Sequence, residues 1–489
     1  MYTRFLTFII FSFIACASAQ WQQEIRLTND PSVSYLSYNN AHCIGVDGSS
    51  IHIVWWDGRD LDREIYYKNS FDFGQTWSED TRLTNIVGWS EYPAIAVTGN
   101  YIHVVWQDDR DLAFHPEIYY KRSTDGGISW EQDKKLATDP SEPGLPSLAV
   151  AENTIHIVWI DLRDGNTEIY YKSSLDNGVT WLPDVRLTND ISISERSSIA
   201  VNNEKVFVVW QDERDNDKEI YFKKSSDNGN TWSGDIRLTN SAGESETPVI
   251  AANGENIYVV WSDSRDGVGN AEIFFKRSSD NGLTWSEDIK VKSSPVASNR
   301  PSLAVSSDFI HISWNEVWEV YYTRSSDNGT NWDSSYLISN SPSWTSENSS
   351  IALSDSAVHI IWMDQKSGNE DIYYIKNSTG NIITGINSIE NQAPSQFLLS
   401  QNYPNPFNPV TRINYTIPAN GFDQTKVILK VFDILGNEIA TLVNEYKNTG
   451  SYTVEFDINS FHKIISSGMY FYTIETNHNK AVKKMILLK

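Results

Sequence analysis

The chain has 489 residues, 40% of them hydrophobic and 12% aromatic, and this length allows two or more domains. A formal net charge of −24 at pH 7 argues against nucleic acid and anionic membrane surfaces as partners, but excludes neither neutral glycans nor metal ions. The acidity lies before Phe397, because the residues from there onward include nine Lys and Arg against seven Asp and Glu.

Residues 1–19 have the pattern of a secretory signal peptide. Arg4 supplies the positive start, an apolar stretch follows, and Ala17-Ser18-Ala19 forms the small-residue cleavage site. Cys16 raises the alternative of a lipoprotein signal, although the residues before it make a poor lipobox. Cleavage would leave Cys43 as the remaining cysteine, which excludes an intramolecular disulfide and a cysteine metal cluster.

The next part of the chain repeats one segment of about fifty residues seven times. Each copy contains short runs of β-branched and aromatic residues bounded by Asn, Asp, Gly or Ser, which is typical of strands. Four strands per copy and seven copies match the blades of a β-propeller. The anchoring tryptophans are Trp55, Trp106, Trp159, Trp210, Trp261, Trp314 and Trp362.

The two ends of the repeat region complete each other. The seventh copy has a third run at residues 371–374 but no fourth, while residues 21–29 repeat the pattern of residues 77–85. We therefore expect the first strand to complete the last blade, which would remove the unpaired edges of an open array. The predicted fold is all-β: a seven-bladed β-propeller over residues 20–378, closed by the N-terminal strand, followed by a small β-sandwich.

Six copies contain Ser-x-Asp-x-Gly-x-Thr-Trp or a close variant, which resembles the Asp-box (BNR) repeat of the sialidase-like propellers. We expect the Asp to accept backbone N–H groups of its own turn, the Gly to take a positive φ and the Trp to pack between sheets. In the resembled family this turn lies opposite the active site, so it is assigned no chemistry. The closing tryptophans are Trp77, Trp130, Trp181, Trp232, Trp285 and Trp332.

The other ends of the strands carry a recurrent Trp-x-Asp-x-Arg pattern, and a further acid precedes the third strand of every copy. An active site is single, whereas a joint in a ring recurs at each blade. We therefore favour a structural network of Asp–Arg–Glu pairs between blades over a charged binding surface. The pairs are Asp57–Arg59, Asp108–Arg110, Asp161–Arg163, Asp212–Arg214 and Asp263–Arg265. No metal or cofactor site is predicted, and calcium binding at this acidic rim stays open.

Five histidines lie three residues before an anchoring tryptophan, which raises the idea of metal ligands. They are His52, His103, His156, His311 and His359. The same position holds Phe207 and Tyr258 in the other two copies. A position that accepts Phe is a packing position, so we expect these histidines to fill the core.

The resemblance to sialidases covers the scaffold and not the catalytic residues. A sialidase needs three unrepeated arginines, a Tyr nucleophile with its Glu, an Asp acid/base and a Phe/Tyr-Arg-Ile-Pro motif, on six blades. The sequence lacks that motif, and its nearest match, Asn299-Arg300-Pro301, has the wrong order. No residue is assigned as catalytic.

Four of the eighteen tryptophans belong to neither repeated position: Trp56, Trp89, Trp318 and Trp344. All four are expected on the rim of units six, seven, one and two, which are consecutive in a closed ring. We hypothesise that they line one arc that stacks on sugar rings, with Glu316, Glu319 or nearby acids accepting hydroxyl hydrogen bonds. The alternative is that each Trp packs its own loop against a neighbour.

The repeat ends near residue 378, and residues 379–396 are predicted to be a linker. Residues 397–489 contain Asn-Tyr-Pro-Asn-Pro-Phe-Asn-Pro, Val-Phe-Asp-Ile-Leu-Gly and Ser-Gly-Met-Tyr-Phe-Tyr. This segment resembles the type A sorting domain of the type IX secretion system. The resemblance implies Sec export, passage through the outer membrane and contact with the secretion machinery, followed by release or attachment to the cell surface.

The sequence thus favours an exported, non-catalytic sialidase-like propeller that binds glycans or other extracellular polymers. An exo-α-sialidase type of glycoside hydrolase is the alternative, and a surface adhesion or structural protein is the second alternative.

Overall fold

The computed structural model describes residues 21–38, 42–60, 62–111, 115–137, 142–267, 269–339, 341, 345–380, 397–399, 402, 405–417, 424–448, 450–458, 465–476 and 479–488. The predicted signal peptide and most of the predicted linker lie outside these residues. The described residues form strands β1–β36 and divide into two compact units, residues 1–384 and 385–489. No helix among them is long and apolar enough to cross a bilayer.

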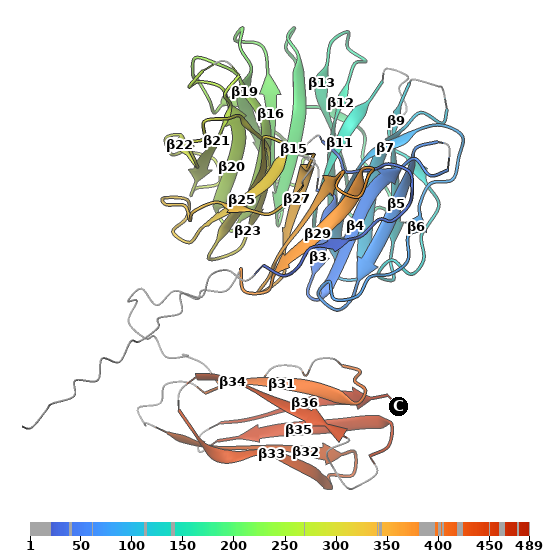
Figure 1. Ribbon diagram of the computed structural model, residues 1–489, viewed down its shortest axis with the longest axis vertical. Helices are drawn as coiled ribbons and strands as arrows, with labels where there is room; N and C mark the ends of the chain where they lie inside the picture. The colour runs from blue at the N-terminus through green and yellow to red at the C-terminus, as the bar shows by residue number, and fades with distance from the viewer. Residues whose placement is uncertain are drawn as a thin grey trace, which may run out of the picture. The chain divides into compact units, whose positions relative to one another are not determined.

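Seven antiparallel sheets, or blades, make up the first unit (Figure 1). Blades 1 to 3 contain β2 (Ser34–Tyr35), β3 (Ile44–Asp47), β4 (Ser50–Asp57), β5 (Glu64–Ser70) and β6 (Thr81–Arg82); β7 (Ser90–Thr98), β8 (Tyr101–Asp108), β9 (Glu117–Ser123) and β10 (Lys134–Lys135); β11 (Gly144–Ala151), β12 (Thr154–Asp161), β13 (Glu168–Ser174) and β14 (Val185–Arg186). Blades 4 and 5 contain β15 (Ser194–Asn202), β16 (Lys205–Asp212), β17 (Glu219–Ser225) and β18 (Ile236–Arg237); β19 (Ser245–Asn253), β20 (Asn256–Asp263), β21 (Glu272–Ser278) and β22 (Ile289–Lys290). Blades 6 and 7 contain β23 (Ser298–Val305), β24 (Ile310–Glu316), β25 (Glu319–Ser325) and β26 (Tyr336–Leu337); β27 (Glu347–Leu353), β28 (Val358–Asp364), β29 (Asp371–Asn377) and β1 (Ile25–Arg26).

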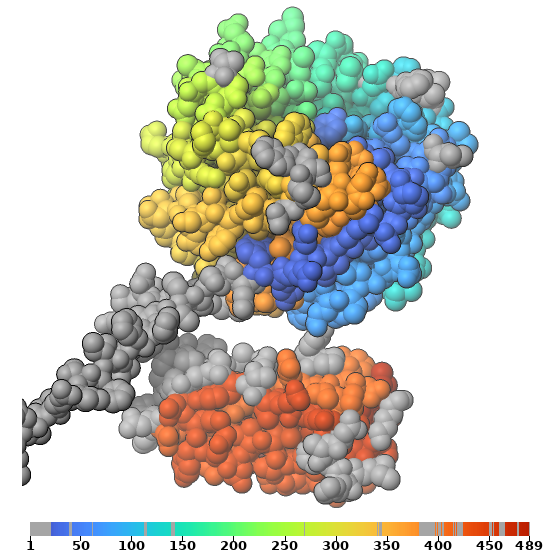
Figure 2. Space-filling model, in the orientation of Figure 1, coloured from blue at the N-terminus to red at the C-terminus, as the bar shows by residue number. Residues whose placement is uncertain are grey.

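The blades form a closed ring, as the sequence predicts. Each blade's inner strand contacts the inner strand of the next, and β27 of blade 7 contacts β3 of blade 1. The N-terminal strand β1 pairs with β29, with Ile25 opposite Tyr374 and Arg26 opposite Tyr373. In Figure 2 the blue N-terminal segment accordingly lies against the orange last blade. Both the seven-bladed fold and its closure by the first strand are confirmed.

Burial explains why the repeated runs form central strands. The second strand of each blade is buried along nearly its whole length, because its two faces pack against the neighbouring blades. The seven anchoring tryptophans are completely buried. Full burial of each large ring makes hydrophobic contact the main stabilising term between blades.

The inner strands carry a β-bulge at a corresponding position in blades 2 to 7. One residue in each bulge has a positive φ: Tyr92, Leu145, Arg196, Thr247, Arg300 and Asn348. A bulge re-aims a side chain and is common beside binding sites. Because these side chains differ from blade to blade, the bulges create a non-repeating surface on a repeating scaffold.

The turns with the pattern Ser-x-Asp-x-Gly-x-Thr-Trp, called the box turns below, have the expected geometry. In blade 3, Asp176 Oδ1 accepts the N–H of Thr180 at 2.8 Å, and the Thr180 hydroxyl donates to Asp176 Oδ2 at 2.6 Å. These bonds, with that from the Thr180 hydroxyl the largest contribution, lower the pKa of Asp176 to about 2. The closing Trp181 packs edge-on against Tyr120 of blade 2.

The histidines before the anchoring tryptophans fill the core, as the sequence predicts, and each also has a tyrosine partner. His103 Nδ1 lies 2.8 Å from the Tyr120 hydroxyl, and the other four pairs have distances of 2.6 to 2.8 Å. Where blade 4 has Phe207 instead, its partner is Phe222. The two positions therefore change together, which the sequence analysis did not detect.

The second unit contains two sheets that share one hydrophobic core. They consist of β30 (Leu398–Leu399), β31 (Val410–Ile417) and β34 (Gly450–Asp457), and of β32 (Thr425–Asp433), β33 (Glu438–Lys447), β35 (Gly468–Glu475) and β36 (Lys480–Leu487). Side chains such as Ile413 and Phe456 from one sheet pack with Leu429 and Tyr472 from the other. The predicted small β-sandwich is confirmed.

Thr28 allows a direct test of the ring closure. Its hydroxyl donates to Asp371 at 3.0 Å and accepts the N–H of Ile372 at 2.9 Å, and Thr188 makes the corresponding bonds to Glu168 and Ile169 inside blade 3. We expect Thr28→Val and Thr188→Val to lower the free energy of unfolding equally, by about 2 kcal/mol, because each leaves buried partners unsatisfied. Urea unfolding measures both. A much smaller loss for Thr28→Val would mean that the terminal strand does not behave as part of the blade.

Candidate functional site

The rim Asp–Arg pairs lie within single blades, not between blades as the sequence analysis expects. In blade 1, buried Asp57 accepts Arg59 at 2.7 Å and Trp55 Nε1 at 3.1 Å. Arg59 also reaches Asp80 of the same blade at 2.7 Å. The equivalent pairs Asp108–Arg110, Asp161–Arg163, Asp212–Arg214 and Asp263–Arg265 have distances of 2.5 to 2.6 Å.

A lysine of the third strand supplies the tie between blades. Lys68 Nζ donates to the Leu27 carbonyl of the terminal strand at 2.6 Å, and Lys172 donates to Leu136 of blade 2 at 3.0 Å. Arginine thus already neutralises the rim aspartates of blades 1 to 5. Among the described residues, no three His, Cys, Asp or Glu side chains are grouped so as to hold a metal ion.

Blade 6 departs from the repeat at the turn between β24 and β25. Glu316 pairs with Glu319, so the loop contains two residues, Val317 and Trp318. Their φ angles are 49° and 65°, a conformation that two-residue hairpin turns require and that Asn and Gly adopt most easily. A β-branched residue and a Trp in this region are each strained by about 1–2 kcal/mol. The Trp318 side chain is nevertheless 56% exposed, so burial of the ring does not offset the strain.

A pocket of 260 Å³ opens beside Trp318. Asn315 from β24 forms one wall and fixes blade 7, because its amide donates to the Ser346 carbonyl at 2.8 Å. Arg300, in the bulge of β23, donates from Nη1 to Glu347 Oε2 at 2.5 Å. The remaining lining residues are Ala297, Asn299 and Val317. The pocket therefore combines one aromatic ring with two amides and an Arg–Glu pair.

The structure covers one of the predicted stacking tryptophans, Trp56. Trp56 is only 9% exposed, because Tyr35 stacks on its ring at 4.5 Å and the Arg63 guanidinium lies 5.0 Å from it. Trp56 therefore presents no open face to a sugar. Trp89 is 39% exposed, with Arg63 at 4.2 Å from its ring. Trp344 lies outside the described residues.

The two predicted acceptor glutamates are already bonded within the protein. Glu316 is buried and accepts Ser294 Oγ at 2.7 Å and Lys292 Nζ at 3.1 Å. Glu319 accepts the hydroxyls of Ser339 and Ser346. That these carboxylates bind sugar hydroxyls stays a prediction, and Glu347 is a further carboxylate that lines the pocket.

A second group of residues, which was not singled out from the sequence, lies around Arg63 where blades 1 and 2 meet. Arg63 forms an ion pair with Glu91, and its guanidinium lies between Trp56 and Trp89. Burial, and then the negative charges of Glu370 and Glu347, raise the pKa of Tyr35 to about 12. The sequence does contain an indication of this group. Arg63 occupies the same repeat position as Trp318, directly before the acid of the third strand.

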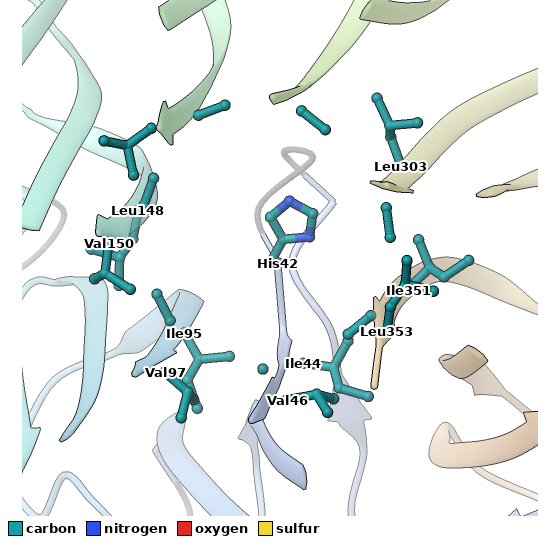
Figure 3. A pocket seen from close by; sticks show the side chains of 18 of the residues that line it. His42, Ile44, Val46, Ile95, Val97, Leu148, Val150, Leu303, Ile351 and Leu353 are labelled. Atoms are coloured by element: carbon teal, nitrogen blue, oxygen red, sulfur yellow. The ribbon is translucent and has the colours of Figure 1, made fainter. Parts of the chain in front are cut away.

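A cavity of 340 Å³ follows the axis of the ring and has a different character (Figure 3). Its walls are aliphatic side chains from corresponding positions of the inner strands, and Figure 3 shows His42 projecting among them. Burial lowers the pKa of His42. A polar ligand needs several convergent polar groups, so the Trp318 pocket is the better candidate site.

Residues 401–488 match the family model described as "Secretion system C-terminal sorting domain". The chain therefore combines a seven-bladed β-propeller with a C-terminal sorting domain of the type IX secretion system. Such a domain indicates secretion or attachment to the cell surface, and it implies interaction with the type IX machinery. A search of the curated proteins finds no match to the sequence.

Solved structures with a similar fold include carbohydrate-active enzymes. The polysaccharide lyase Uly1 aligns with a TM-score of 0.50 at 11% identity, over 73% of this chain and 99% of that one. Trypanosoma rangeli sialidase aligns with a TM-score of 0.42 at 13% identity, over 83% and 85% of the two chains. An α-L-arabinofuranosidase from Fusarium graminearum aligns with a TM-score of 0.42 at 14% identity, over 56% and 89%. At these identities the similarity concerns the fold alone.

Proposed function

We propose that the propeller binds a sugar residue of an extracellular polymer in the Trp318 pocket, and that it does so without catalysis. The observation that carries the proposal is a half-exposed Trp beside two amides and an Arg–Glu pair in a pocket of 260 Å³. Sugar rings present an apolar face to an aromatic ring and hydroxyls to polar side chains, so this combination suits them. On the same proposal, the box turns are Asp-box repeats with a structural role.

The strained turn supports a ligand-binding role. Unusual backbone conformations persist at functional sites, where the geometry serves binding at the expense of stability. Val317 and Trp318 have such a conformation, although Asn and Gly would relieve it. A two-residue turn fixes the backbone that carries the ring, so little backbone entropy is lost when a ligand stacks on it.

The carboxylates near the pocket favour binding over hydrolysis. A glycosidase of the usual kind needs two carboxyl groups on either side of the scissile bond. Glu347 is the one carboxylate among the described lining residues, and Arg300 engages it. The raised pKa of Tyr35 keeps its phenol neutral at neutral pH, which disfavours it as a nucleophile.

The test is the double substitution Val317→Asn with Trp318→Gly. We expect it to raise the free energy of unfolding by about 2 kcal/mol, because an Asn-Gly turn relieves the strain at both residues, whereas the greater backbone freedom of Gly in the unfolded chain offsets part of this gain. We also expect it to abolish glycan binding, because the stacking ring is gone. A glycan array followed by calorimetry measures binding, and urea unfolding measures stability.

Tyr336→Ala is the matched control, since Tyr336 is an exposed aromatic residue on the outer strand of the same blade. It should leave glycan binding unchanged. Undiminished binding by the double variant would refute the role of the pocket. A fluorogenic sialoside assay distinguishes the alternatives: turnover would favour a sialidase-type hydrolase, and neither turnover nor glycan binding would favour an adhesion protein.

A further inference from the structure

A second pocket, of 290 Å³, lies between blades 4 and 5 at the end of the strands that carries the box turns. Lys205 starts β16 and Lys224 lies near the end of β17, whereas Asn281 belongs to the box turn of blade 5. Phe207 and Trp232 supply an apolar wall. Because the Trp318 turn lies at the opposite ends of the strands, this pocket, called the lysine pocket below, is separate from the proposed glycan site.

Two ammonium groups converge in the lysine pocket. Lys205 Nζ donates to Asn281 Oδ1 at 3.0 Å, and Lys224 Nζ donates to the backbone carbonyl of Asn281 at 2.7 Å. Neither lysine forms an ion pair with any residue that the structure describes, although the chain has a net charge of −24. Two ammonium groups that bond the same residue repel each other unless an anion lies between them.

Comparison with the other blades shows that this arrangement is specific to blade 4. The position of Lys224 is basic in several blades, and the side chain regularly donates to a carbonyl of the next box turn, as Arg122 and Arg277 do. The position of Lys205 is basic in blade 4 alone, with Ser50, Tyr101, Thr154, Asn256, Phe309 and Ala357 in the other blades. Blade 4 thus has basic residues at both of these positions, whereas every other blade has a basic residue at one of them at most.

Blade 4 also lacks the acid that balances this position in blades 2 and 6. In blade 2 Arg122 pairs with Glu131 at 2.7 Å, and in blade 6 Arg324 pairs with Asp333 at 2.9 Å. Both acids directly follow the closing Trp of the box turn, where blade 4 has Ser233. The nearby Asp280 is bonded to Thr284 of its own turn. Burial lowers the pKa of Lys224; the negative charge of Asp280 opposes this effect, and the positive charge of Lys205 adds to it.

We propose that the lysine pocket binds an oxyanion, the sulfate or phosphate group of a substituted polymer or of a free salt, between Lys205 and Lys224. Two ammonium groups and the exposed hydroxyl of Ser226 supply donors for three separate oxygens. The apolar wall fits the carbon skeleton of a substituted sugar.

The experiment uses the full chain with sodium sulfate, sodium phosphate, dextran sulfate and unsubstituted dextran, all at constant ionic strength. Thermal unfolding with and without each probe is compared for wild type, for Lys205→Gln with Lys224→Gln, and for Lys205→Gln alone. Lys134→Gln is the matched control, because Lys134 donates to the carbonyls of Gly178 and Val179, while its neighbour Lys135 forms ion pairs with Asp111 and Glu117. Sulfate stabilises most proteins by exclusion, so the difference between variants is the readout.

We expect the oxyanion probes to raise the unfolding temperature of wild type and of the control more than that of the double variant, with binding at least tenfold weaker in the double variant and intermediate in the single one. Binding of dextran sulfate but not dextran identifies a polymer-borne group, and binding of the inorganic ions alone identifies a free ion. An equal response of wild type and double variant to every oxyanion probe, or no binding by wild type, overturns the proposal.

Discussion

Lowering the pH from 7.5 to 5 should strongly destabilise the propeller, because its buried histidines are neutral in the folded state. Burial is the main cause that lowers the pKa of His52 and His156 to about 4 and that of His103 and His359 to about 3. In an unfolded chain the histidine pKa is about 6.5. Between these values the unfolded state binds more protons, so each histidine lowers the unfolding free energy by about 1.4 kcal/mol per pH unit below 6.5.

A residue pair found in one blade can be introduced into another blade to test this expectation. His103→Phe with Tyr120→Phe copies the Phe207–Phe222 pair of blade 4 into blade 2. At pH 5 the variant should lose about 2 kcal/mol less stability, relative to pH 7.5, than wild type does. Urea unfolding followed by tryptophan fluorescence at pH 7.5, 6.5 and 5 gives the comparison.

His115→Gln is the control for the acid experiment, because the His115 side chain is 42% exposed. It should leave the pH dependence unchanged. If the His103/Tyr120 double variant showed the same pH dependence as wild type, His103 would not be a neutral group whose protonation opposes folding.

Gly178→Ala should be among the most destabilising single substitutions in the propeller. Gly178 belongs to the box turn of blade 3, has a φ of 81°, and lies so close to Tyr120 of blade 2 that an added Cβ would overlap the phenol. The ring cannot swing away, because His103 and Trp181 hold it on two sides. Backbone strain and overpacking together should lower the unfolding free energy by about 3 kcal/mol.

Gly254→Ala separates the two causes. Gly254 has a φ of 61°, but a Cβ there would meet nothing within 4 Å. We expect a loss of about 1 kcal/mol from the backbone alone. Equal losses for the two variants in urea unfolding would mean that the contact with Tyr120 contributes nothing, and that the glycine serves only the turn.

The fold was predictable because its rules repeat along the chain. Seven anchoring tryptophans establish the period, and the recurrence of one pattern at residues 21–29 and 77–85 identifies the strand that closes the ring. Because the chain contains seven copies of one pattern, each copy can be compared with the others, and an irregular copy is recognisable without any other sequence. The same comparison indicated that the histidine position belongs to the core.

The site was only partly predictable, because it depends on how unrepeated side chains stack across blades. Trp318 was identified, but Trp56 was expected to be open, and the sequence does not reveal that Tyr35 and Arg63 cover it. Arg300 reaches Glu347 from a bulge with positive φ, and the pattern of alternating strand residues does not predict that direction. Comparing every residue type across the copies, and not tryptophan alone, would have identified Arg63.

The ring closes between Thr28 and Asp371, which are 343 residues apart. Contacts at such a separation form late, since the chain between them must be ordered before they contribute stability. A polypeptide that emerges N-terminus first therefore cannot complete its last blade until nearly the whole repeat region is available. During synthesis the ring therefore stays open until the last blade has emerged, so the order of synthesis sets the moment at which the propeller becomes rigid.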